Sequence, residues 1–115
     1  MVIVFIAGPY RAKNNWSLTV NISRAAGVAL AVWKMGAAVI CPHLNCAPFQ
    51  GAAPDSVWLK GDLAMLDRCD AVVALPNWTE SVGARAEVAR ARAAGKPVFV
   101  WPNPIGLRRW IADNS

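Results

Sequence analysis

The sequence contains only three cysteines and no long apolar run. Its longest apolar stretches, residues 2–7 and 25–32, are well short of the roughly 18 residues that cross a bilayer, so we expect no membrane association. The first of these runs has no basic residue before it and ends at once in Gly8-Pro9, which favours a strand over a signal peptide. With an odd number of cysteines, we expect free thiols and a cytoplasmic protein rather than a disulfide framework.

Charged residues are also few, at 17% of the 115 residues, whereas hydrophobic residues make up 56%. This balance predicts one folded domain over residues 1–115 and excludes a disordered chain. Twelve basic residues against seven acidic ones give a net charge of +5, which favours anionic ligands in general. Because the basic residues form no block or stripe, specific binding to nucleic acid is not expected.

Apolar runs and helical spacing alternate along the chain. Short β-rich runs predict four strands, at residues 2–7, 37–41, 71–75 and 97–101. Helical periodicity predicts helices at residues 15–35, 55–68 and 82–94 and a short terminal helix after Gly106. Strands that alternate with helices predict an α/β fold: an open parallel sheet of four to five strands with helices on both faces.

Three details of this prediction concern the packing of the first helix and the tryptophans, the start of the second long helix, and one long loop. In the first helix, Leu30 and Trp33 belong to the apolar stripe that is expected to face the core, and most of the six tryptophans are expected to be core residues. Asp55 or Ser56 is expected to cap the second long helix. Residues 43–54 are expected to form a long loop, which in a compact domain is usually functional.

Polar residues gather after three of the predicted strands. In an open parallel sheet, ligands bind beyond the carboxyl ends of the strands. The segments at residues 8–14, 42–51 and 76–87 follow the first, second and third strands. We therefore expect these three segments to share one crevice.

Glu87 is one of only two glutamates and lies in the second turn of a predicted helix beside this crevice. A carboxylate at this position is suited to act as a nucleophile or base, because carboxylates displace leaving groups at sugar carbons. The alternative is a surface carboxylate that pairs with Arg90 or Arg92. Spacing alone leaves both open.

Asp62 lies between Leu59 and Leu66 on its helix, on or beside the apolar stripe. A carboxylate on the core-facing side needs a partner or a function. Asp62 is therefore either a boundary residue bonded to a nearby backbone group or arginine, or an acid that projects into the crevice. Both alternatives remain open from the spacing.

Ser81 and Gly83 stand at the start of the helix that carries Glu87. Free backbone N–H groups and the helix dipole favour an anion such as phosphate at such a start, although a simple serine cap gives the same pattern. Arg11 and Lys13, after the first strand, either add positive charge to the crevice or are solvated.

The segment Cys41-Pro-His-Leu-Asn-Cys46 does not match a standard zinc pattern, so no metal ligand is expected in this chain. His43, its only histidine, is expected to donate a hydrogen bond to a ligand or to the loop backbone. Tyr10 and Trp78 lie at crevice loops and are candidates for stacking on a base.

Four motifs occur in this order: Phe5-Ile-Ala-Gly-Pro-Tyr10, Cys41-Pro-His43, Asp62-Leu-x-Met-Leu-x-x-Cys-Asp70 and Ser81-Val-Gly-Ala-x-x-Glu87. Together they resemble the nucleoside 2-deoxyribosyltransferase superfamily over about residues 2 to 100. The resemblance implies a flavodoxin-like fold and cleavage of the N-glycosidic bond of a nucleoside or nucleotide. It also implies that no cofactor is needed and that the chain forms a homodimer or a higher homo-oligomer.

By this resemblance, Glu87 is the nucleophile and Asp62 orients the site and supports protonation of the leaving group. Two carboxyl groups about 5 Å apart would suit a double-displacement, retaining mechanism. At the Ser81 position, transferases that act on free nucleosides carry an aspartate and hydrolases of nucleoside 5′-monophosphates carry a serine. The serine therefore favours a nucleotide N-glycosidase, since a carboxylate would repel a phosphate.

The remaining contacts to a small nucleotide substrate are assigned by position. Phosphate and sugar are expected at Gly8, Pro9, Tyr10, Arg11, Ser81 and Gly83, and the base at His43, Asn45 or Trp78.

The related deoxyribosyl transfer between bases is the same chemistry with another acceptor. A second hypothesis is a non-catalytic nucleotide-binding or sensor protein on the same fold. A third, nucleic-acid binding, rests only on the net charge and would require strongly salt-dependent affinity.

Overall fold

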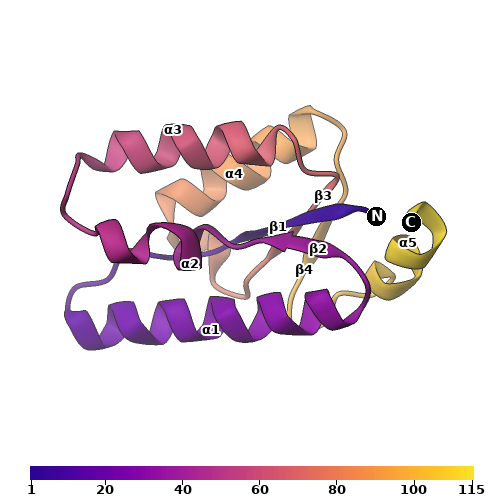
Figure 1. Cartoon of the computed structure of the whole chain (residues 1–115), viewed down its shortest axis with the longest axis horizontal. Helices are drawn as coiled ribbons and strands as arrows, with labels where there is room; N and C mark the ends of the chain where they lie inside the picture. Colours follow the sequence, from indigo (N-terminus) through magenta and orange to yellow (C-terminus); the bar gives the residue numbers. More distant parts are fainter.

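A computed structural model describes residues 1–115 and contains one parallel sheet of four strands (Figure 1). The strands follow the order β2-β1-β3-β4, and each lies within the apolar run that predicted it. Their bounds are β1 Ile3–Ala7, β2 Ala38–Ile40, β3 Ala71–Ala74 and β4 Val98–Val100. The prediction of an α/β fold with an open, flavodoxin-like parallel sheet is confirmed, with four strands.

The structure has five α-helices, and Figure 1 shows α1 on one side of the sheet and α3 and α4 on the other. They are α1 Asn15–Lys34, α2 Pro42–Cys46, α3 Asp55–Leu66, α4 Val82–Ala93 and α5 Leu107–Asn114. Helices α1 and α5 contribute to the core on one face of the sheet, and α3 and α4 contribute to the core on the other. Helices on both faces explain why the strands read as continuous apolar runs rather than as alternating ones.

Strand β1 lies in the middle of the sheet and separates the two cores. Successive side chains of a strand point to opposite faces, so Val4 and Ile6 pack on the α1 side while Phe5 and Ala7 pack on the α3 and α4 side. All four are fully buried. The loop that leaves β1 is thereby fixed at the centre of the carboxyl edge, where the crevice was predicted.

The prediction of a long loop at residues 43–54 is wrong for the first half of that segment. Pro42 occupies the first turn of α2, where its missing N–H costs no hydrogen bond, and a short 3-10 turn follows at Ala47–Phe49. The predicted cap of α3 is also wrong. Pro54 precedes the helix without a side-chain cap, and the Asp55 carboxylate pairs with Arg11 instead.

The prediction that most tryptophans are core residues is wrong as far as burial goes, although Trp78, Trp101 and Trp110 pack partly buried against the core. None of the six is buried, and Trp16 and Trp33 are mostly exposed, as is Leu30. The inward face of α1 is instead made of smaller side chains, Ala25, Val28, Ala29 and Val32. Small residues let the helix lie close to the sheet, and the bulky ones remain on its outer side.

Two polar contacts hold α3 and α4 together at the end away from the crevice. The Arg90 guanidinium donates two hydrogen bonds to the Asp67 carboxylate, at 2.7 and 2.6 Å. Lys96 Nζ, just after α4, donates to three carbonyl oxygens at and after the end of α3, those of Leu66, Asp67 and Cys69, at 2.6 to 2.9 Å. These bonds satisfy carbonyls that a helix end leaves without partners.

No helix has both the length and the apolarity that a membrane span requires.

Candidate active site

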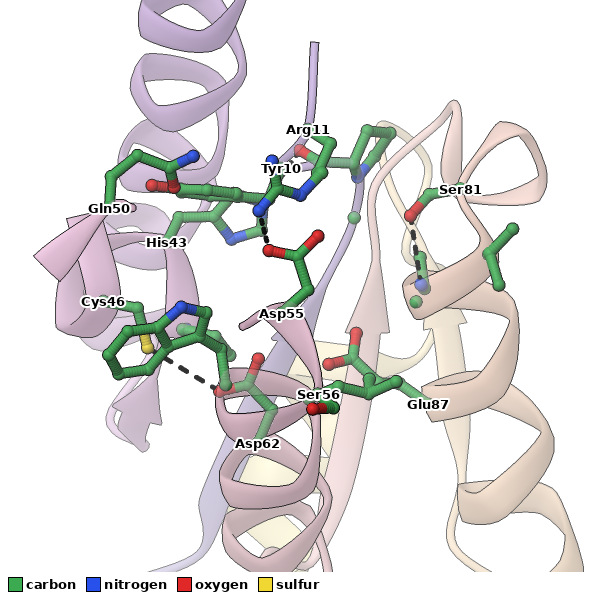
Figure 2. A pocket seen from close by; sticks show the side chains of 18 of the residues that line it. Tyr10, Arg11, His43, Cys46, Gln50, Asp55, Ser56, Asp62, Ser81 and Glu87 are labelled. Carbon is green, nitrogen blue, oxygen red and sulfur yellow. Dashed lines mark hydrogen bonds and ion pairs between the residues drawn. The ribbon is translucent and has the colours of Figure 1, made fainter. Parts of the chain in front are cut away.

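A cavity of about 590 Å³ opens at the carboxyl edge of the sheet (Figure 2). Its walls come from the loop after β1, the helix α2 after β2, and the start of α4 after β3, which are the three segments that the sequence places at one crevice. The first two turns of α3 form a further wall, of which the sequence analysis assigned only Asp62 to the crevice. A cavity of this size suits a nucleoside-sized ligand.

Glu87 lies on the α4 wall and is only 6% exposed. Neither arginine proposed as its surface partner is available, because Arg90 pairs with Asp67 and Arg92 lies over the Trp78 ring at 5.5 Å. The three ion pairs of the structure all join other residues. The reading of Glu87 as a surface ion-pair residue is therefore wrong.

Asp62 faces the same cavity from α3, as Figure 2 shows, and is half-buried. Its Oδ1 lies 4.0 Å from the Cys46 Sγ, and no arginine or lysine pairs with it. Of the two alternatives for Asp62, the structure therefore supports an acid that projects into the crevice.

The two carboxyl groups influence each other's ionisation. Burial raises the pKa of Asp62 to about 6. Burial first, and the negative charge of Asp62 second, raise the pKa of Glu87 to about 8. Removing water from a carboxylate disfavours its charged form, and a second nearby carboxylate does the same. At neutral pH the two groups therefore hold close to one proton between them.

Ser81 caps α4, and its Oγ accepts a hydrogen bond from the Ala84 N–H at 3.1 Å. Ser81, Gly83 and Ala84 line the cavity, so the first turn of α4 presents its backbone to the space above Glu87. The cap does not distinguish an anion site from simple capping, because the same hydroxyl serves both. A Cβ at Gly83 would meet no atom closer than 3.9 Å, which leaves the approach to this turn open.

Arg11 lies at the mouth of the cavity and pairs with Asp55 across it. The side chains are 58% and 61% exposed, so water and salt screen the pair. Gly8, Pro9 and Tyr10 line the cavity on the same loop, whereas Lys13 does not. Gly8 has no room for a side chain, since a Cβ there would lie 2.3 Å from the Leu75 Cδ1.

His43 lines the cavity but is 2% exposed, and its ring serves the loop backbone. Nε2 lies 2.9 Å from the Pro9 carbonyl oxygen, which requires the proton on Nε2, and Nδ1 faces the Cys41 thiol at 3.9 Å. Burial lowers the pKa of His43, so the ring is neutral. His43 thereby ties α2 to the loop that carries Tyr10, whose ring centroid lies 5.9 Å from the imidazole.

Two residues assigned to the base lie outside the cavity. Asn45 is exposed, and its amide nitrogen lies 4.0 Å from the sulfur of Met65 on α3. Trp78 packs on the core between the sheet and helices α3 and α4. Their placement does not support contact with a ligand, because a position in a crevice loop does not fix the direction of the side chain.

Trp58 is the aromatic residue of the cavity wall that the sequence analysis missed as a site residue. It lines the cavity from α3 and stacks on Phe49, with ring centroids 6.1 Å apart and planes inclined by 15°. Trp58 and Asp62 are four residues apart, so they share one face of the helix. That spacing was the signal by which Trp58 could have been found.

Residues 2–103 match the protein family described as a domain of unknown function (DUF1937). The chain belongs to this family. None of the curated proteins compared with the chain matches it.

Among solved structures, the fold is similar to that of a 2-deoxyribosyltransferase from Bacillus psychrosaccharolyticus, with a TM-score of 0.65. The sequences are 17% identical, and the match covers 85% of this chain and 70% of the transferase. The work on that transferase describes it as a biocatalyst for the synthesis of antiviral and antitumoral nucleosides. This DUF1937 domain thus has the fold that the sequence resemblance predicted.

Proposed function

We propose that the chain cleaves the N-glycosidic bond of a (deoxy)nucleoside 5′-monophosphate, or transfers its sugar to another base, through Glu87. One observation carries the proposal: a buried glutamate without a basic partner faces a nucleoside-sized cavity beside a second carboxyl group. Structural proteins rarely bury such a pair, because each unpaired carboxylate costs free energy. The likeness to a 2-deoxyribosyltransferase supports the same chemistry.

In the proposed mechanism, the Glu87 carboxylate attacks the anomeric carbon while the carbon–nitrogen bond to the base breaks. At neutral pH the proton of the pair resides mainly on Glu87, whose pKa is the higher of the two, so it passes to Asp62 as Glu87 becomes the nucleophile, and Asp62 then donates it to the leaving base. Water, or a second base, then attacks the anomeric carbon and releases Glu87. Two displacements retain the configuration at the sugar.

The walls of the cavity suggest how the substrate lies. The first turn of α4, at Ser81 and Gly83, offers backbone N–H groups to the 5′-phosphate, and Arg11 adds positive charge from the opposite loop when it exchanges Asp55 for the phosphate. Trp58 and Tyr10 offer aromatic faces to the base.

Homo-oligomeric assembly and a cytoplasmic location stay predictions, and the three free thiols are compatible with a reducing compartment.

The test follows base release by chromatography from matched ribo- and deoxyribonucleosides and their 5′-monophosphates. Release from the monophosphates by the parent chain, and its loss in Glu87→Gln, is the expected result. Asp113→Asn, which alters an exposed carboxylate of α5, is the control for the change of an acid to its amide. Release only after addition of an acceptor base would identify a transferase. Binding without release, even over long incubation, would favour the non-catalytic sensor.

A further inference from the structure

The cavity is acidic, although the chain as a whole carries a charge of +5. Its lining includes a single basic side chain, Arg11, and four carboxyl groups, those of Asp55, Asp62, Glu80 and Glu87. Arg11 is already paired with Asp55. The other three carboxyl groups have no basic partner anywhere in the chain. Within the chain only protonation reduces this negative charge, so a cationic group of a ligand would compensate it directly.

Two of the three carboxyl groups without a basic partner, those of Asp62 and Glu87, lie in the same part of the cavity, which we call its deep part. Asp62 and Glu87 face it from neighbouring helices, one half-buried and the other buried. The Cys46 thiol, 4.0 Å from Asp62, is the polar side chain beside them, and it supplies no charge. A neutral ligand that displaces water from this region would make the two groups still harder to ionise. A cationic ligand would have the opposite effect.

Aromatic side chains accompany these carboxyl groups. Trp58 lies one helical turn before Asp62 on α3, and Tyr10 lies on the loop opposite, so two aromatic rings and two acids line one space. Aromatic faces attract organic cations through their negative π-surfaces, and a carboxylate beside them adds to that attraction. The combination fits a flat cationic ring better than a neutral one.

Given the glycosyl chemistry proposed above, on which this inference rests, we propose that the site selects nucleotides whose base is a cationic aromatic ring. An N-glycosylpyridinium and an N7-alkylated purine nucleotide share this chemistry. In both, the carbon–nitrogen bond breaks with its electron pair moving to the ring nitrogen, and the base leaves neutral without needing a proton. Glu87 forms the glycosyl ester in the same step. Water then attacks the anomeric carbon, Glu87 leaves as a carboxylate, and the proton of the water passes to Asp62.

The experiment compares ligands that differ in the charge of the ring. Isothermal titration of Glu87→Gln, in which cleavage is prevented, is carried out with nicotinamide mononucleotide and with its neutral 1,4-dihydro form. A second pair, N7-methylguanosine 5′-monophosphate and guanosine 5′-monophosphate, distinguishes a pyridinium from a purinium ligand. We expect the cationic member of at least one pair to bind about tenfold more tightly or better.

The double variant Asp62→Asn/Glu87→Gln tests the origin of that preference. It removes both deep carboxylates, and we expect the preference to fall about tenfold relative to Glu87→Gln alone. The double variant Asp62→Ser/Glu87→Gln, in which cleavage is also prevented, gives a second measurement if Asp62→Asn/Glu87→Gln does not fold. Equal affinities within both pairs, or a preference that survives the loss of Asp62, would overturn the inference.

The two proposals fail in different ways. If the parent chain releases base from neutral monophosphates in a Glu87-dependent manner while the titrations show no preference for a cation, the proposed function stands and this inference falls. If cationic nucleotides bind more tightly but no base is released, the cleavage proposal falls and the charge selection stands.

Discussion

Asp62 and Glu87 face one cavity from the adjacent helices α3 and α4, and the charge on Asp62 contributes to the raised pKa of Glu87. The sequence separates them by 25 positions, and neither has a basic partner. Two carboxyl groups in this arrangement lose their protons in sequence, the second with more difficulty than the first. Ionisation of this pair therefore affects two quantities: the free energy of unfolding and the fraction of Glu87 that is available as a carboxylate nucleophile.

The pH dependence of stability should change when Glu87 becomes glutamine. The pKa of Glu87 is about 8 in the fold against an ordinary value of 4.5, so between these values the folded chain binds more protons than the unfolded one. The free energy of unfolding of the parent chain therefore falls as pH rises through this range. At pH 8.5, Glu87→Gln should be more stable than the parent by up to about 5 kcal/mol. Urea unfolding at pH 5, 7 and 8.5 measures this, and an unchanged pH slope in the variant would contradict it.

Ser81 should decide between phosphorylated and free substrates. Ser81→Asp retains a side chain that caps α4 but places a negative charge at the proposed phosphate position. We expect kcat/KM for 5′-monophosphates to fall about tenfold or more, while kcat/KM for the matching nucleosides does not fall. Ser81→Ala is the control, with a loss of about 1 kcal/mol in stability and no selective effect of charge. An equal loss for both substrate classes in Ser81→Asp would argue against a phosphate at this turn.

Trp58 and Trp78 form a matched pair of half-buried tryptophans, one inside the cavity and one outside it. Trp58→Leu removes an aromatic face from the wall, so the Kd for a nucleotide should rise up to about tenfold. Trp78→Leu should lower the unfolding temperature and leave the Kd unchanged. Titration calorimetry and thermal melts of both variants separate the two effects. A larger rise in Kd for Trp78→Leu would show that the base lies elsewhere.

Gly8 should tolerate no side chain while Leu75 is present. A Cβ at Gly8 would lie 2.3 to 2.9 Å from three atoms of the Leu75 side chain, so Gly8→Ala should cost about 1–3 kcal/mol in stability. Gly83→Ala is the control, because the nearest atoms there lie at 3.9 Å. Adding Leu75→Ala should relieve the clash, so that the double variant loses less than the sum of the two single losses. Strict additivity would show that the loop moves away instead.

The strands and the sheet could be predicted because their signal is local. Each strand is a short apolar run that ends near Gly, Pro or Cys, and parallel strands are buried on both faces. The first helix was predicted within one residue of its bounds, but not its orientation. Trp33 fits the apolar stripe by spacing, yet it lies on the outer side, because small side chains on the other positions let the helix approach the sheet.

The candidate site was predictable where the backbone alone places a residue. Gly8 and Ser81 follow strands, so the topology brings them to the crevice. Trp58 and Asp55 lie on a helix that approaches the crevice only through tertiary packing, and no local pattern reports this. The burial of Glu87 was likewise hidden, since its neighbour Arg90 finds a partner in Asp67 on another helix.

The ion pair between Arg11 and Asp55 joins two sides of the cavity mouth, and both side chains are largely in solvent. Dissolved ions weaken such a pair because they screen charges over distances of about 10 Å at 0.1 M. We therefore expect the association rate constant of an uncharged nucleoside, which feels no long-range attraction, to rise with ionic strength as the pair opens more often. For such a ligand, the salt dependence of binding would report the opening of the cavity mouth rather than electrostatic steering.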